Sequence, residues 1–156
     1  MISVEIPGYR SMQLAHLVMD YNGTLAVDGE IEPGVGPLLE KLAAHLKIHV
    51  VTADTFGLAA KRLAGSPVEL SVLPPGEQDV AKRNYVNELG GAGTVAVGNG
   101  RNDRLMLAAA GLGIAVILDE GAAFETLAAA DVICRGIRPA LELLVHPLRL
   151  TATLRA

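Results

Sequence analysis

Short apolar runs alternate with segments of helical periodicity along almost the whole chain. The runs are four to seven residues long and rich in valine, isoleucine, leucine and alanine, a pattern typical of strands covered on both faces. Strands are predicted over residues 14–20, 47–53, 68–73, 94–98, 113–118 and 131–134. This alternation predicts an α/β fold, a three-layer sandwich with a mostly parallel, Rossmann-like sheet.

Between the strands, apolar residues recur every three or four positions, as in helices with one buried face. A helix is predicted to start at Pro33 and to reach Leu46, and further helices are predicted over 58–63, 77–89, 102–110, 121–129 and 137–154, the last bent or broken near Pro147. The pair Asp28-Gly29 favours a two-residue hairpin turn and predicts a small β-flap over 25–31. Residues 2–6 alternate like an edge strand, but the pattern does not give their partner.

The composition narrows the class of protein. The chain has 156 residues, so residues 1–156 are predicted to form one domain, and 51% hydrophobic with 19% charged residues excludes a disordered chain. The net charge is −4 without a basic stripe, so nucleic acid is not an expected partner. The longest uncharged apolar run, 105–118, is shorter than the about 20 residues that span a bilayer, and residues 1–10 do not resemble a signal peptide. We therefore expect a cytoplasmic protein with no membrane partner.

Polar residues directly follow three of the predicted strands. The segments are DYNGT at 20–24, TAD at 52–54 and GNGRND at 98–103. Because ligands bind at the carboxyl ends of the strands in open α/β sheets, we expect the three segments to meet in one crevice. Singly, each has a simple structural explanation, since Asn-Gly pairs form turns and Thr52 or Asn102 can cap a helix. Neither role needs a carboxylate at Asp20 or a second one at Asp103, which points to a functional site.

The same segments resemble motifs of the haloacid dehalogenase (HAD) superfamily. DYNGT resembles motif I (DxDxT), Thr52 after an apolar strand resembles motif II, and GNGRND resembles motif IV, whose usual form is GDGxxD or GDGxND. Their order and spacing also agree, over nearly the whole chain. In these motifs the chain is most similar to the small soluble proteins that resemble the phosphorylation domain of P-type ATPases.

The resemblance implies a Mg²⁺-dependent phosphohydrolase, phosphatase or ATPase-like, that forms an aspartyl-phosphate on Asp20. The implied catalytic residues are Asp20, Asn22, Thr52 and Lys82. The implied metal site comprises Asp20, Asn22 through its backbone carbonyl, Asn99 and Asp103. The implied phosphate-binding residues are Asp20, Gly23, Thr24, Thr52, Ala53 and Lys82, with Asn102 in support. Because motif III is a lone basic residue, Lys61 remains an alternative to Lys82.

Two asparagines depart from the usual pattern of the superfamily. Asn22 stands where its phosphatases have the aspartate that protonates the leaving group and then activates water, so turnover is expected to be slow. Asn99 stands where an aspartate is usual, so metal binding should be weaker. The alternative interpretation is a catalytically weak or inactive phosphate-binding, phosphoacceptor or regulatory module.

No cap domain is expected between the motifs. The stretches 20–52 and 52–82 have room only for the flap, two helices and two strands. Capless members of the superfamily act on macromolecules or close the site with a neighbouring subunit. The resemblance therefore implies a phosphorylated substrate of unknown identity and allows a homo-oligomer that closes the uncapped site. The apolar segment 141–150 either covers the sheet or forms such an interface.

Particular residues exclude other α/β sites. A dinucleotide fingerprint, G-x-G-x-x-G, starting at Gly98 would need glycine where the chain has Asp103, and no G-x-x-x-x-G-K-[ST] is present for a P-loop. A two-component receiver domain would need an acidic pair after the first strand and its phosphoacceptor after the third, and neither is present.

Overall fold

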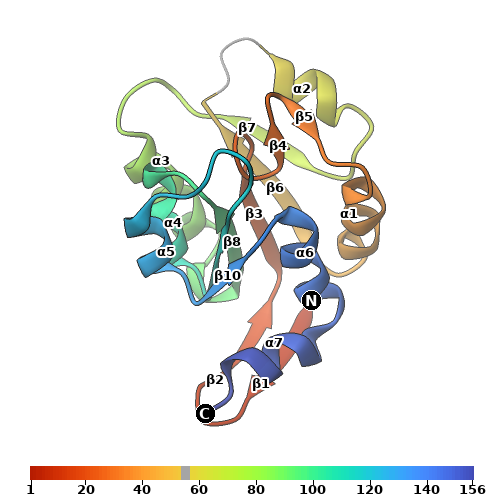
Figure 1. Cartoon of the computed structure of the whole chain (residues 1–156), viewed down its shortest axis with the longest axis vertical. Coiled ribbons are helices and arrows are strands. Elements are labelled where there is room, and N and C mark those ends of the chain that lie inside the picture. Colours follow the sequence, from red (N-terminus) through yellow and green to blue (C-terminus); the bar gives the residue numbers. More distant parts are fainter. Residues whose placement is uncertain (54–56) are drawn as a thin grey trace.

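The centre of the fold is a six-stranded sheet in which every neighbouring pair of strands is parallel (Figure 1). The computed structural model describes residues 1–53 and 57–156, and Asp54 of the second polar segment lies outside them. In spatial order the strands are β10 (Val132–Cys134), β9 (Leu112–Val116), β8 (Thr94–Gly98), β3 (His16–Asp20), β6 (Lys47–Thr52) and β7 (Glu69–Val72). The six strands predicted from the sequence are confirmed, with ends that differ by at most two residues.

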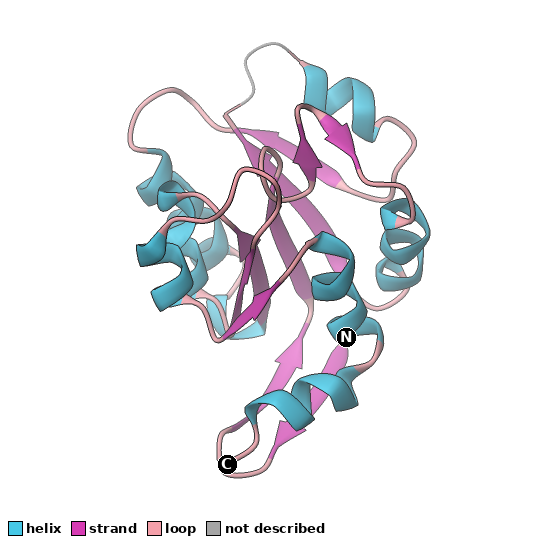
Figure 2. Cartoon of the chain, viewed as in Figure 1, coloured by secondary structure: helices cyan, strands magenta, loops and turns pink. Residues whose placement is uncertain are grey.

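Helices cover both faces of this sheet, which confirms the three-layer sandwich (Figure 2). On one face are α1 (Val35–Ala43), α2 (Leu58–Leu63) and α6 (Ile137–Val145), and on the other are α3 (Gln78–Glu88), α4 (Arg104–Ala109) and α5 (Phe124–Ala129). Successive residues of a strand point into different layers. Leu17 and Met19 of β3 pack in the core with α1 and α6, whereas Val18 packs with α3 and α4.

Several helices start later than the sequence predicts, and α1 begins at Val35 instead of Pro33 and ends at Ala43 instead of Leu46. The helix expected over 102–110 opens with a 3₁₀ turn, η2 (Arg101–Asp103), and α4 follows it. Another 3₁₀ turn, η1 (Gly91–Gly93), lies directly before β8. The helix expected from Gly121 begins at Phe124, because the residues before it are held by other partners. The N–H of Ala123 donates to the carbonyl of Asn99, 2.9 Å away, so the chain is anchored to the end of β8 before α5 can start.

An N-terminal hairpin lies outside the main sheet, which the sequence did not predict. Its strands, β1 (Ile2–Ile6) and β2 (Arg10–Leu14), form an antiparallel two-stranded sheet, so the strand predicted over 14–20 is divided between β2 and β3. The predicted closing helix is also divided, into α6 and α7 (Pro147–Leu154), because Pro147 has no N–H to continue the first helix. Helix α6 covers the main sheet and α7 packs on β1, so the C-terminal segment covers its own chain.

The predicted flap follows β3 directly. Its strands are β4 (Ala26–Val27) and β5 (Glu30–Ile31), joined by Asp28 and Gly29 with φ values of 50° and 79°, as a two-residue hairpin turn requires. The hydroxyl of Tyr21 donates to the carbonyl of Gly29 at 2.9 Å and ties the flap to the residue after Asp20. From Asp20 to α3 the described residues form only this flap, α1, β6, α2 and β7, so they contain no cap domain.

Polar side chains on β3, β6, β7 and α3 are connected away from the carboxyl ends of the strands. His49 of β6 is 1% exposed, and its Nε2 lies 3.1 Å from Nδ1 of His16. Its Nδ1 lies 3.0 Å from the hydroxyl of Tyr85 on α3, which also accepts a hydrogen bond from Ser71 at 3.2 Å. Burial lowers the pKa of His49 below its ordinary value, because the charged imidazolium loses hydration there.

We expect His49 to make the protein less stable as the pH falls below about 6.5. Its pKa is lowered in the folded state, so in that range the unfolded chain binds the proton first and is favoured, by up to about 1.4 kcal/mol per pH unit. Urea unfolding of the wild type and His49→Gln between pH 5 and 8 measures this component as the difference between the two pH profiles. The control His45→Gln, at an exposed position, should keep the wild-type profile; an unchanged slope in His49→Gln would contradict the prediction.

Candidate active site

The two strands that carry the acidic segments lie side by side in the middle of the sheet. After β3 the chain adds β6 and β7 on one side and then returns to add β8, β9 and β10 on the other, so the connection reverses direction between β3 and β8. Ligands of open α/β sheets bind outside the carboxyl ends of the strands at such a reversal. Here those ends are Asp20 of β3 and Gly98 of β8.

A buried lysine joins the acidic residues of the first and third segments. The Nζ of Lys82, on α3, donates to Oδ1 of Asp20 at 2.9 Å and to Oδ1 of Asp103 at 2.7 Å. The side chains of Lys82 and Asp103 are only 2% and 0% exposed. The structure therefore places Lys82 against Asp20, whereas Lys61 is exposed on α2.

Asp103 is fully engaged within the protein. Its Oδ2 accepts the N–H groups of Asn99 and Gly100, each at 2.9 Å, while Oδ1 receives Lys82. The close approach depends on Gly98, because a Cβ there would lie 2.5 Å from Cβ and 2.6 Å from Cγ of Asp103. Asp103 thus fixes both the loop after β8 and the position of the lysine.

The pKa values of Asp20 and Lys82 are both raised, by burial at Asp20 and by neighbouring carboxylates at Lys82. Burial, together with the charge of Asp103, raises the pKa of Asp20 to about 7, although Lys82 and the N–H of Tyr21 favour the ionised form. Burial alone would lower the pKa of Lys82, but the carboxylates of Asp20 and Asp103 raise it above its ordinary value. Near neutral pH the cluster therefore contains a charged ammonium and a carboxyl group close to its midpoint of ionisation.

Replacing Lys82 with methionine is expected to destabilise the protein strongly. The substitution leaves two buried carboxylates without their cation, and breaking a buried ion pair from one side costs about 3–5 kcal/mol. The cost should be smaller at pH 6 than at pH 8, because protonation of Asp20 removes one of the charges. Urea unfolding at both pH values measures it, with the exposed Lys61→Met as the matched control. Equal stability of the two variants would contradict the assignment.

The other residues predicted for the site differ in their burial and in their hydrogen-bond partners. Thr24 is buried, and its hydroxyl donates to Oδ1 of Asn99 at 3.2 Å. Thr52 is buried at the end of β6, whereas Ala53 is exposed. Asn22 and Gly23 lie in the turn after β3, and Asn102 lies in η2, with both asparagines exposed. The structure therefore brings Asp20, Thr24, Lys82, Asn99 and Asp103 into one connected group.

The atoms of this group that could bind a metal ion are oxygens. Among residues 1–53 and 57–156, no three acidic, histidine or cysteine side chains are close enough to hold a metal ion. The residues that the sequence predicts for a metal site offer the carboxylates of Asp20 and Asp103, the side-chain oxygen of Asn99 and the backbone carbonyl of Asn22. Carboxylate, amide and carbonyl oxygens suit Mg²⁺, which binds few protein ligands and keeps several waters, so these residues fit that ion.

One charged residue beside this group was missed from the sequence. Glu120 lies in the loop after β9, and a Cβ added to Gly23 would be 2.6 Å from its Oε2 and 2.5 Å from Nδ2 of Asn99. Asp119 and Glu120 follow the end of the strand predicted over 113–118, which is also a carboxyl end where a parallel sheet can bind its ligand.

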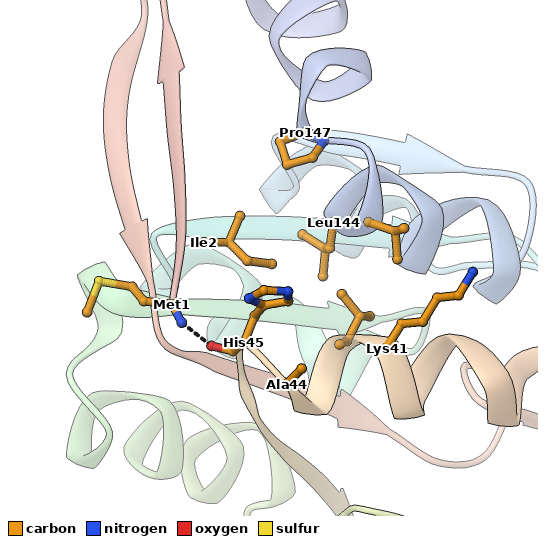
Figure 3. A pocket seen from close by; sticks show the side chains of 9 residues that line it. Met1, Ile2, Lys41, Ala44, His45, Leu144 and Pro147 are labelled. Atoms are coloured by element: carbon orange, nitrogen blue, oxygen red, sulfur yellow. Dashed lines mark hydrogen bonds between the residues drawn. The ribbon is translucent and has the colours of Figure 1, made fainter.

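A separate apolar hollow lies at the opposite end of the sheet. It has a volume of about 600 Å³, and its walls come from the start of β1, the end of α1 and the junction of α6 with α7 (Figure 3). Ile2 and Leu144 provide apolar walls, and Lys41 and His45 lie beside them. None of the residues that line it belongs to the group around Asp20, so it is not part of the candidate site.

No helix within the described ranges is both long and apolar enough to span a bilayer.

Comparison with known proteins gives one related sequence and many related folds. No protein-family model matches the chain. The uncharacterized protein MJ0073 from Methanocaldococcus jannaschii is 42% identical over 84 residues, which are 51% of this chain and 90% of that protein.

Solved structures with a similar fold include several phosphatases. The cobalt-bound deoxy-D-mannose-octulosonate 8-phosphate phosphatase from Haemophilus influenzae has a TM-score of 0.72 at 16% identity, over 92% of this chain and 94% of that one. The corresponding phosphatase from Moraxella catarrhalis, in complex with magnesium, phosphate and the sugar KDO, has a TM-score of 0.68 at 19% identity, over 85% and 86%. A phosphoserine phosphatase in apo form has a TM-score of 0.69 at 15% identity, over 85% and 100%. At these identities the likeness shows a shared fold.

Proposed function

The chain belongs to the same protein family as MJ0073 and has the fold of HAD-superfamily hydrolases, and from this premise we propose that it is a Mg²⁺-dependent phosphohydrolase that works through an aspartyl-phosphate on Asp20. The observation that carries the proposal is the buried ammonium of Lys82 between Asp20 and Asp103, at the carboxyl ends of β3 and β8. A buried nucleophilic carboxylate beside a fixed cation is the arrangement that attack on an anionic phosphoryl group requires.

The reaction proceeds in two displacements at phosphorus. A carboxylate oxygen of Asp20 attacks, its bond to phosphorus forms, and the bond from phosphorus to the leaving-group oxygen breaks, with the electron pair on that oxygen. The leaving group takes a proton from water. A second water then attacks the phosphorus of the aspartyl-phosphate, and the bond from phosphorus to Asp20 breaks with its electron pair on the carboxylate. The proton that this water loses combines with the hydroxide left by the first step, so inorganic phosphate and the free carboxylate are formed.

The residues around Asp20 would bind and orient the phosphoryl group. Lys82 offsets the negative charge that the oxygens carry in both steps, and Asp103 holds the lysine in place. Thr52 lies buried at the end of β6 and Thr24 in the turn after β3, where hydroxyl and backbone N–H groups can donate to phosphoryl oxygens. Magnesium, held by Asp20, the Asn22 carbonyl and Asn99, would reduce the repulsion between carboxylate and phosphate.

Turnover is expected to be slow because Asn22 cannot act as a general acid or base. An amide neither protonates a leaving group nor removes a proton from water near neutral pH, and this form of catalysis is typically worth about 10²–10⁴-fold. The same feature favours a second candidate, a phosphate-binding or phosphoacceptor module that forms the aspartyl-phosphate but releases it too slowly to serve as an enzyme.

Phosphate release from a substrate panel tests the proposal. The panel contains p-nitrophenyl phosphate, acetyl phosphate, ATP, phosphoserine, a sugar phosphate and a phosphopeptide, each with Mg²⁺ and with EDTA. Release that depends on Mg²⁺ supports the phosphohydrolase. If no substrate is hydrolysed but acetyl phosphate adds the mass of one phosphoryl group to the protein, the phosphoacceptor module is the better description.

A further inference from the structure

The loop between β9 and α5 is fixed to the end of β8. Nδ2 of Asn99 donates to the carbonyl of Gly121 at 3.1 Å, and the carbonyl of Asn99 accepts the N–H of Ala123 at 2.9 Å. A turn in which the N–H of Gly121 donates to the carbonyl of Leu118, also at 2.9 Å, closes the other side. Glu120 lies inside this turn, so its backbone is held beside Asn99.

The carboxylate of Glu120 reaches over the loop that carries the nucleophile. Gly23 has φ +75°, and a Cβ there would lie 2.6 Å from Oε2 of Glu120 and 2.9 Å from Oδ1 of Asn99. The glycine therefore leaves room for these two oxygens to lie side by side. No hydrogen bond or ion pair engages the Glu120 side chain among residues 1–53 and 57–156, so its charge is not neutralised by a neighbour there.

The buried cluster offers little net negative charge to a bound cation. Lys82 carries one positive charge and Asp20 and Asp103 carry one negative charge each when ionised, so the buried cluster has a net charge of only −1. Both oxygens of Asp103 already accept hydrogen bonds, from Lys82 and from the N–H groups of Asn99 and Gly100, so part of its negative charge is offset within the protein. Asn99, at the position that faces Gly23, is neutral.

We propose that Glu120 supplies the negative charge that Asn99 lacks and holds the magnesium ion from its outer shell, through a water of hydration. This inference rests on the proposed function, because it concerns the metal of the same site. An outer-shell role agrees with the absence of a three-residue acidic cluster in the described ranges and with the waters that Mg²⁺ normally keeps. Glu120 is therefore a positioning residue for the cation.

Asp119 provides a matched control one residue away. It is exposed and acidic, but it lies along a different hollow, of about 540 Å³, formed with the flap and Arg135. Removing its charge changes the net charge of the protein as much as removing that of Glu120, but at a position on another surface.

Metal binding, measured without turnover, tests the inference. Mn²⁺ binding is followed by electron paramagnetic resonance and Mg²⁺ binding by calorimetry, in the full chain and at 0.15 M salt. We expect Glu120→Gln to weaken both about 10- to 100-fold, as outer-shell changes do, and Asp119→Asn to bind as the wild type does. Adding Asn99→Asp to Glu120→Gln should restore binding, because the missing charge returns to the neighbouring position. Equal melting temperatures in EDTA establish that the variants fold.

The outcomes separate this inference from the proposed function. Wild-type affinity in Glu120→Gln, or equal weakening in the two single variants, overturns the role of Glu120 even if Mg²⁺-dependent phosphate release is observed. Glu120-dependent binding without phosphate release supports the role and overturns the hydrolase. A wild-type protein that binds neither ion overturns both.

Discussion

Replacing Asp20 with asparagine is expected to abolish phosphate release and, at the same time, to stabilise the metal-free protein at pH 8. The amide cannot attack phosphorus, and loss of a nucleophile typically costs a factor on the order of 10⁴ or more. The effect on stability has the opposite sign, because the buried carboxylate is the group that the fold accommodates with difficulty.

The sign follows from the direction of the pKa shift. In the folded protein the pKa of Asp20 is raised from 3.8 to about 7, so the proton bound there adds stability below pH 4, and that stability is lost as the pH rises through 7. At pH 8 the ionised side chain therefore lowers the free energy of unfolding. Asparagine carries no such charge, and we expect the variant to be more stable by about 1–3 kcal/mol.

Two measurements on the same samples check this prediction. Phosphate release is measured with Mg²⁺, and urea unfolding is measured in EDTA at pH 5 and pH 8. The stabilisation should be present at pH 8 and much smaller at pH 5. The exposed control Asp119→Asn should change neither quantity. An active Asp20→Asn would exclude the aspartyl-phosphate mechanism, and equal stabilisation at both pH values would exclude the raised pKa.

Replacing Asn22 with aspartate is expected to increase the rate of phosphate release by about 10²–10⁴-fold. Asn22 is exposed on the loop after β3, two residues beyond the nucleophile, so a carboxyl group there is open to a leaving group and to water. That group can donate a proton in the first displacement and accept one in the second. Single-turnover kinetics with acetyl phosphate separate the two steps, and hydrolysis of the aspartyl-phosphate should gain the most.

The control for this variant is Asn87→Asp, which adds the same charge at an exposed asparagine near the end of α3. It should leave the rate of phosphate release unchanged. If Asn22→Asp is no faster than the wild type while its aspartyl-phosphate still forms, the missing acid does not limit turnover and the phosphoacceptor reading gains support.

The apolar pattern sufficed to predict the six main strands, the flap and the positions of the acidic segments. These features depend on local periodicity, on turn residues such as Asp28-Gly29 and on the rule that strand ends form the ligand site of a parallel sheet. Asp20 and Asp103 could be chosen from the sequence for this reason, because Asp20 ends a predicted strand and Asp103 lies in the polar segment that follows another.

The features that the sequence did not predict depend on contacts between segments that lie far apart in the chain. Lys82 and Lys61 have similar local sequences, and only the packing of α3 against the ends of β3 and β8 brings Lys82 to Asp20. Periodicity also does not identify the partners of β1 and α7. Strand β1 pairs with β2, and α7 packs on β1. Glu120 lies 97 positions beyond Gly23 in the sequence but above it in space, because the turn at Gly121 is bonded to Asn99. The sequence alone therefore determined which residues end the strands, whereas the burial and charge around Asp20 were set by side chains that meet only when the sheet and its helices are assembled.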